Sequence, residues 1–244
     1  GRRAFTEDAE RAAVFLAGEF EAAGLQSLEG TQGYLQNFPV YSVQTESSRV
    51  VVDGVTLAAS QVLVRVAEPS LSWSTGDARV VVVGPGDDPQ EQVLPLLQGG
   101  ASTLVFIHPQ HRTTFSNLTR FFRGTSRSLE GGAGGALVLA LVDASADAGY
   151  EVEASATISE DLLMNVVGMI PGRRSDEFVL FSAHYDHIGI RTPVESDSIA
   201  NGANDDASGT TAVVALARYF AERGTPERTL LFAAFTAEEG GGYG

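Results

Sequence analysis

The sequence predicts an α/β protein, a three-layer sandwich in which helices cover a central mixed, largely parallel sheet. Two observations predict this class. The runs at residues 178–183 and 229–235 are apolar throughout, as expected of strands that are buried on both faces of a sheet. Between them, residues 208–221 have helical periodicity, with Val213 and Ala217 on one face. Strands linked by a helix in this way are typical of a sheet covered by helices.

The N-terminal element is an amphipathic helix, expected over residues 6–23. Its apolar residues recur at helical spacing, and Gly24 stands where a left-handed residue would end the helix. We therefore expect a surface helix with one buried face. The stripe consists of Ala13, Leu16, Ala17 and Phe20.

Residues 34–67 have a different texture, in which β-branched residues are broken by turn signals. The runs at 38–43, 50–52 and 62–66 are predicted strands, and Asp53-Gly54 is a hairpin signal between them. This part is expected to form antiparallel strands.

The middle of the chain alternates short apolar runs with glycine-rich or polar stretches, as in an inserted lid-like segment or a small subdomain. The glycine-rich residues 131–135 are interpreted as a surface loop, because no Lys-Ser/Thr pair follows to make a phosphate-binding loop. The predicted strands here are 79–83, 103–107 and 136–142.

A chain of 244 residues is long enough for one large domain with an insertion. We divide it into an N-terminal helix and strands of the main domain, an inserted lid-like or small subdomain, and the core of the main domain. In that order, the expected boundaries are 1–69, 70–156 and 157–244.

Composition excludes several classes of partner. The 16 basic residues are all arginine, and 31 acidic residues give a net charge of -15, which repels nucleic acid and anionic lipid. No apolar run is long enough to cross a bilayer, so no membrane partner is expected. The absence of cysteine excludes disulfides and thiolate chemistry. We expect a secreted or periplasmic protein, although the chain shows no signal peptide, and its oligomeric state is left open.

Three groups of polar residues stand at the edges of the apolar runs. His184 and Asp186 follow one predicted strand, Asp205 precedes the helix, and Glu238 and Glu239 follow the next strand. Sites in open α/β sheets form at the carboxyl ends of strands, so these groups are expected at one rim. Imidazole and carboxylates without cysteine suit a divalent metal such as zinc. The pattern favours a metal-dependent hydrolase.

Each group also has a structural interpretation when it is taken alone. A lone His184 is more often a satisfied histidine at a strand end, and Asp205-Asp206 serves equally well as a solvated, helix-capping pair. Taken together, adjacent acids beside apolar strands repel one another unless a cation compensates. The combination therefore favours the metal site. Extended backbone would place His184 and Asp186 on the same side, so that Asp186 can orient the imidazole.

The residues also resemble a known family. The segments Asn165 to Gly172, Ser182 to Gly189, Asn201 to Gly209 and Thr236 to Gly241 are similar, in order and spacing, to the bacterial dizinc aminopeptidases of the leucyl aminopeptidase type. The resemblance covers about the last eighty residues. It implies an aminopeptidase that hydrolyses N-terminal peptide bonds of peptide substrates with two zinc ions.

Carried over by position, the resemblance implies that His184 binds one zinc, Asp205 bridges both zincs and Glu239 binds the second. Glu238 would be the general base, and Asp186 would orient His184. Both are therefore implied catalytic residues. Cleavage would proceed by direct attack of water.

The family supplies two further ligands beyond the paired glutamates, whereas this sequence ends at Gly244. We therefore expect the C-terminal part of the fold to be missing, a longer parent enzyme, and impaired activity and weak metal affinity in this chain. His187 is expected to accompany the motif without binding metal, and His108 and His111 are expected on a surface or lid loop.

Alternative functions remain. A related dizinc carboxypeptidase or deacylase uses a similar set of residues, although the string Asp205 to Gly209 favours the aminopeptidase over it. A glutaminyl cyclase relative is disfavoured, because Asp would more often precede the ligand Glu239. A noncatalytic binding protein that keeps the fold is the alternative from another class.

Overall fold

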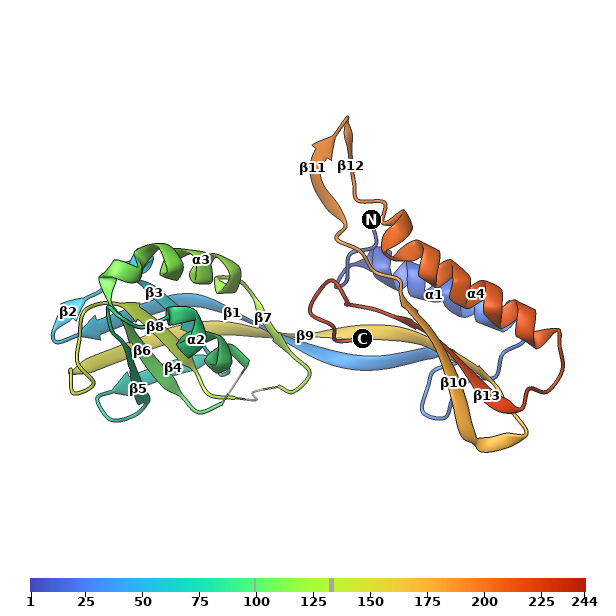
Figure 1. The fold of residues 1–244 in the computed structure, drawn as a ribbon, viewed down its shortest axis with the longest axis horizontal. Helices are drawn as coiled ribbons and strands as arrows, with labels where there is room; N and C mark the ends of the chain where they lie inside the picture. The colour runs from blue at the N-terminus through green and yellow to red at the C-terminus, as the bar shows by residue number, and fades with distance from the viewer. Residues whose placement is uncertain (99, 132–133) are drawn as a thin grey trace. The chain divides into compact units, whose positions relative to one another are not determined.

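The structure is a computed structural model that describes residues 1–98, 100–131 and 134–244, and it divides into two compact units (Figure 1). Unit 1 consists of Gly1–Pro39 and Asp161–Gly244, and unit 2 consists of Val40–Glu160. The strands β1 (Leu35–Val52) and β9 (Tyr150–Ile170) run through the boundaries between them. Each unit is described below by itself.

The sheet of unit 1 is mixed. Strand β10 (Arg174–His184) pairs in parallel with β13 (Arg228–Phe235), and β13 pairs antiparallel with the C-terminal part of β9. The helix α4 (Ser208–Ala221) connects the two parallel strands, which need such a crossover. The expected helix at 208–221 and the expected strands at 178–183 and 229–235 are confirmed, as are the α/β class and the mixed character of the sheet.

Two helices cover one face of this sheet. Helix α1 (Glu7–Ala22) and α4 lie side by side over the strands (Figure 1). The predicted stripes are the buried ones, because helical spacing brings their apolar residues to one face. Gly24 has a φ of +76° and ends the first helix as predicted. The best-buried side chains of this core are Ala13, Phe20, Val166, Ala217 and Phe232.

Unit 1 is completed by a short hairpin and an irregular helical turn. The hairpin pairs β11 (Ile190–Val194) with β12 (Asp197–Ile199), and the turn spans Ala203–Ala207 directly before α4. Both belong to the segment that joins β10 to α4.

Unit 2 is built on a four-stranded sheet in which one pair is antiparallel and two are parallel. Its order is β3 (Val62–Arg65), β8 (Leu137–Leu141), β6 (Thr103–Ile107) and β5 (Arg79–Val83). The expected strands 79–83, 103–107 and 136–142 are confirmed.

Two further layers cover the faces of this sheet. The first is formed by the unit 2 parts of β1 and β9, with which short strands pair: β2 (Val55–Thr56), β4 (Ser70–Ser74) and β7 (Ser126–Ser128). The second contains the helices α2 (Pro89–Val93) and α3 (Arg112–Phe122). Short 3-10 turns stand at Ala59–Gln61, Leu94–Gln98 and Pro109–His111.

Alternation along the central strands fills both interfaces of unit 2. In β6, Leu104 and Phe106 pack toward β1 and β9, whereas Val105 and Ile107 pack toward α2 and α3. Successive side chains of a strand point to opposite faces, so a strand between two layers must be apolar at every position. This explains why the strand has no polar alternation.

The expected antiparallel strands of residues 34–67 differ from the observed ones. The runs at 38–43 and 50–52 are parts of one continuous strand, β1, and the run at 62–66 pairs in the other sheet as β3. The turn at Asp53-Gly54 is confirmed, because both residues have positive φ (47° and 78°) between paired Val52 and Val55.

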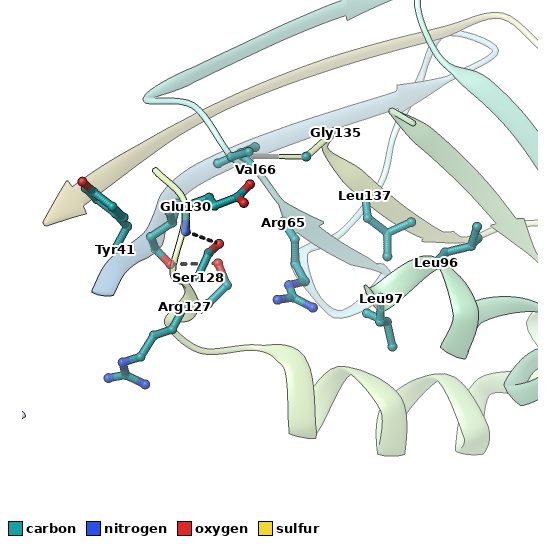
Figure 2. Close-up of a pocket in the computed structure, with 14 residues that line it drawn as sticks. Tyr41, Arg65, Val66, Leu96, Leu97, Arg127, Ser128, Glu130, Gly135 and Leu137 are labelled. Carbon is teal, nitrogen blue, oxygen red and sulfur yellow. Dashed lines mark hydrogen bonds between the residues drawn. The ribbon is translucent and has the colours of Figure 1, made fainter. Parts of the chain in front are cut away.

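Unit 2 also contains a pocket of about 180 Å³ beside β7 (Figure 2). Side chains of both polarities line it, including Tyr41, Arg65, Leu96, Arg127 and Glu130. The predicted glycine-rich loop at 131–135 adjoins it, but residues 132 and 133 lie outside the described residues. The role of residues 70–156 as a lid stays a prediction.

Candidate metal centre

The three polar groups predicted to converge all lie at one end of the unit 1 sheet. His184 is the last residue of β10, and Glu238 and Glu239 stand in the turn after β13. These strands are parallel neighbours, with His184 in register with Phe235. Their carboxyl ends therefore meet at the same edge, where α4 and its preceding turn begin. Asp205 belongs to that turn.

The imidazole of His184 lies among carboxylates. Its Nε2 atom is 3.0 Å from Oδ1 of Asp205 and 3.8 Å from Oε2 of Glu238. Its Nδ1 atom is 3.6 Å from Oδ1 of Asp186, on the side that the sequence predicts but beyond hydrogen-bond distance. One ring nitrogen thus faces Asp205 and Glu238, and the other faces Asp186.

A second imidazole, that of His187, also belongs to the cluster. Its Nδ1 atom is 2.7 Å from Oε1 of Glu239. Ligand atoms of His187, Asp205 and Glu239 all lie within 4.8 Å of one another, close enough to hold one ion. From the sequence, His187 was expected to accompany the motif without binding metal. Its contact with Glu239 depends on the path of the chain after Asp186, which the sequence pattern does not predict.

Burial divides the cluster into two kinds of side chain. The imidazoles are nearly enclosed, since His184 is 15% exposed and His187 13%. The carboxylates of Asp205 and Glu238 are 65% and 59% exposed. A ligand from solvent would therefore meet Asp205 and Glu238 first.

Asp186 is fully buried and links two segments of the site. Its Oδ1 atom accepts a hydrogen bond of 3.1 Å from the N–H of Glu238. Burial raises the pKa of Asp186, and the hydrogen bond from Glu238 and the nearby His184 oppose that rise. Because the bond joins the turn after β10 to the turn after β13, Asp186 fixes the base candidate relative to the imidazole.

Opposing effects act on the pKa of His184. Burial lowers the pKa, but the negative charges of Asp186, Glu238 and Asp206 raise it, and the result lies above the usual value. A positive charge at this position is thus stabilised by the surrounding carboxylates.

The neighbouring acids Asp205 and Asp206 serve different ends. The Oδ1 atom of Asp206 accepts a hydrogen bond of 3.0 Å from the N–H of Gly209 in the first turn of α4, and its Oδ2 accepts one of 3.3 Å from the N–H of His184. A Cβ at Gly209 would lie 2.4 Å from the Asp206 carboxylate, so glycine is needed there. The helix-capping interpretation thus describes Asp206, whereas Asp205 faces His184.

Hydrogen bonds to a buried side chain hold the start of the turn that carries the paired glutamates. The N–H of Thr236 donates to Oδ1 of buried Asn165, which in turn donates to Gln36. Ala237, fully buried, has a φ of +54°, a left-handed conformation that costs about 1 kcal/mol or more for a residue with a Cβ. The turn therefore keeps a strained backbone directly before Glu238.

The donor set fits a divalent cation. Among the described residues, the ion pairs of Asp186, Asp205, Glu238 and Glu239 are all with histidine, so no arginine offsets their charge. The buried atoms Nδ1 of His184 and Oδ2 of Asp186 have no hydrogen-bond partner within the described part of the chain. Imidazole and carboxylate donors of this kind suit zinc.

Among the described residues of unit 2, no comparable cluster is found. His108 and His111 stand there, where Nε2 of His111 lies 2.9 Å from the carbonyl oxygen of Gly84. Of the residues lining the pocket of Figure 2, Glu130 is the only acid, and none is histidine. The candidate centre is therefore in unit 1.

Comparison with protein families supports the predicted resemblance for the C-terminal segment. Residues 165–244 match the model of Peptidase family M28. The match contains all the predicted site residues: His184, Asp186, Asp205, Glu238 and Glu239.

Two curated fungal proteins are similar to the same part of the chain. A probable zinc metalloprotease of Leptosphaeria maculans is 41% identical over 83 residues, which is 34% of this chain and 19% of that protein. A probable zinc metalloprotease of Pyricularia oryzae is 40% identical over 83 residues, covering 34% and 16%. The chain thus matches less than a fifth of the length of these relatives.

Solved structures are similar over nearly the whole chain at low identity. An aminopeptidase from Aneurinibacillus sp. strain AM-1 is 15% identical with a TM-score of 0.47, covering 98% of this chain and 60% of that one. A zinc aminopeptidase from Bacillus subtilis is 15% identical with a TM-score of 0.39, covering 97% and 57%.

Proposed function

We propose, on the premise that residues 165–244 are a Peptidase family M28 sequence, that this chain carries catalytic residues of a zinc-dependent aminopeptidase. The observation that carries the proposal is the convergence of His184, Asp205 and Glu238 at one strand end, with His184 Nε2 only 3.0 Å from Asp205. The names of the curated relatives, probable zinc metalloproteases, support the choice of metal.

His184, Asp205 and Glu239 would hold the zinc. Asp205 lies between the two imidazoles, 3.0 Å from Nε2 of His184 and within 4.8 Å of ligand atoms of His187 and Glu239. This central position supports its assignment as the residue shared by two ions. Bound zinc supplies a Lewis acid and lowers the pKa of water.

Glu238 would act as the general base. Its carboxylate is more than half exposed and lies 3.8 Å from the imidazole of His184, so water and substrate can reach it beside the ligands. From there it can take a proton from the attacking water and return it to the leaving amine. Asp186 assists by holding the N–H of Glu238 and by facing Nδ1 of His184.

The substrate class is a peptide with a free N-terminus. Peptides follow from the family match, whereas the choice of the N-terminal bond follows from the resemblance of the motif strings in the sequence. No described helix is long and apolar enough to cross a membrane. Export to the periplasm or medium stays a prediction.

The test combines zinc analysis with Glu238→Gln. We expect the purified chain to bind zinc weakly and to hydrolyse an aminoacyl p-nitroanilide slowly. The variant should retain that zinc while losing about 10²- to 10⁴-fold in rate, as is typical when a general base is removed. Glu222→Gln, at an exposed position after α4, is the matched control and should not change the rate.

Each other outcome has a definite meaning. Full activity in Glu238→Gln would refute the role of that residue. Absence of zinc from the full-length protein would support the noncatalytic binding protein instead.

A further inference from the structure

Arg2 contacts two of the three segments that carry the proposed zinc ligands, the one beside His184 and the one before Asp205. Its Nε atom donates a hydrogen bond of 2.8 Å to the carbonyl oxygen of Tyr185. Its two terminal nitrogens donate to the carbonyl oxygens of Asn201 (2.9 Å) and Gly202 (3.1 Å). One guanidinium therefore bonds to main-chain oxygens of two segments that the β11–β12 hairpin separates in the chain.

The contacted carbonyls stand close to the ligands in the chain. Tyr185 lies between His184 and Asp186, and Gly202 is followed by the turn that contains Asp205. The Gly202 oxygen also accepts a hydrogen bond from the N–H of Ala207, which closes that turn. Arg2 thus bonds to the main chain beside His184 and before the turn with Asp205, two residues whose side chains face each other.

The main chain of the N-terminal segment is bound to the same loop. The carbonyl oxygen of Arg2 accepts a hydrogen bond of 2.8 Å from the N–H of His187. A Cβ at Gly189, which has a φ of +81°, would lie 2.7 Å from the Cβ of Arg3. Residues 2 and 3 therefore pack directly against the loop after β10, and Arg2 is fixed at both its backbone and its side chain.

The geometry requires arginine. A guanidinium presents five N–H groups in a rigid planar fork, so it can bond several acceptors at fixed separations. A lysine at this position has a single ammonium on a flexible stem and cannot reproduce the three directions. The guanidinium therefore fixes the separation of the main-chain oxygens that it bonds, which a single positive charge cannot do.

We propose that Arg2 is a positioning residue that sets the separation of the loops bearing His184 and Asp205, and thereby the affinity of the centre for zinc. The zinc part rests on the proposed function. Supporting groups around a metal site typically change metal affinity 10- to 100-fold when they are lost. Arg2 bonds to the main chain beside the ligands, so we expect an effect of about tenfold, near the lower limit of that range.

The test compares Arg2→Met, Arg2→Lys and the control Arg3→Met in the full chain. Arg3 is the exposed neighbour, so its substitution removes the same charge without removing the fork. Zinc affinity is measured by competition with a chelator. We expect about tenfold weaker binding in both Arg2 variants, with no recovery in Arg2→Lys, and unchanged binding in Arg3→Met.

Cobalt replacement gives a signature that general destabilisation would not change. The visible absorption of bound Co²⁺ reports its coordination geometry, and we expect a changed spectrum in Arg2→Met at saturating cobalt. An unaltered spectrum together with unaltered zinc affinity would overturn the proposal.

Hydrogen exchange of the metal-free chain tests, without zinc, whether the hydrogen bonds of Arg2 hold the two segments together. The amides of His187 and Ala207 should exchange faster in Arg2→Met than in Arg3→Met, because each is held beside a bond of Arg2. Equal exchange rates in Arg2→Met and Arg3→Met would overturn the proposal that Arg2 holds the two segments together, even if zinc binding failed. If the parent chain binds no zinc, the proposed function fails, and the exchange rates alone decide whether Arg2 joins the loops. Arg2→Lys serves the same comparison if Arg2→Met does not fold.

Discussion

The Nδ1 atom of His187 lies 2.7 Å from Oε1 of Glu239, so the loop after β10 and the turn after β13 are joined by a pair of side chains. Glu239 is a proposed zinc ligand, and His187 is nearly enclosed. The imidazole can therefore hold the carboxylate in one orientation, or bind the same ion as Glu239.

Replacing His187 with alanine should weaken zinc binding about tenfold or more, because Glu239 would lose the group that orients it. Chelator competition measures the affinity. His108→Ala, which removes a histidine from unit 2, is the control and should leave the affinity unchanged. Equal affinities for the two variants would show that Glu239 needs no support from His187.

Gly209→Ala should destabilise the protein by about 1–3 kcal/mol, although alanine is normally the better helix residue. The added Cβ would lie 2.4–2.7 Å from the carboxylate atoms of Asp206. Asp206→Ala alone should cost about 1–2 kcal/mol, because it removes the cap of α4.

The double variant separates these effects. In the Asp206→Ala background the clash is gone, so Gly209→Ala should become neutral or stabilising. Urea unfolding of the four proteins measures the coupling. Strictly additive free energies would contradict the close contact.

Phe232→Ala should lower the free energy of unfolding by about 3–5 kcal/mol, because the ring is fully buried and stacks on Phe181 with centroids 5.5 Å apart. Phe178→Ala on the neighbouring strand is the control. Its ring is 66% exposed, so the change should stay within about 0.5 kcal/mol. Similar losses in both variants would contradict the assigned core.

Asp77 should make the stability of unit 2 depend on pH in the acidic range. Its Oδ2 atom accepts hydrogen bonds from the N–H (2.7 Å) and the hydroxyl (2.9 Å) of Ser74. These bonds, the backbone one first, lower the pKa of Asp77 below its usual 3.8. The stabilisation is therefore fully present above 3.8 and is lost as the pH falls through the lower pKa of the folded state.

Urea unfolding of the parent and Asp77→Asn at several pH values tests this. The parent should be the more stable above about pH 5, and the difference should shrink below pH 4 as the carboxyl is protonated. A difference that does not change with pH would rule out the assigned hydrogen bonds.

Local patterns were sufficient to predict the elements that surround the site. The runs that became β10 and β13 are continuously apolar, and the stripes of α1 and α4 recur at helical spacing. The first part of β9 is absent from the predicted strands, although buried and exposed residues alternate along Tyr150–Ser155. Helix α3 was not predicted, although Phe115, Leu118 and Phe122 recur at helical spacing.

The site was predictable where its residues stand at the ends of such elements. His184, Asp205 and Glu238 were selected for that reason, and the structure places them together. The contacts of Arg2 carry no local signal, because they join positions about 200 residues apart. The contact between His187 and Glu239 depends on the path of an irregular loop, which periodicity does not describe.

The difference in exposure between the imidazoles and the carboxylates has a kinetic consequence. Because Asp205 and Glu238 face solvent while His184 and His187 lie behind them, an incoming cation would first exchange its hydration shell for carboxylate oxygens. Capture of the ion would then be accelerated by negative charge and slowed by added salt, whereas its release would be limited by the nitrogen donors in the interior.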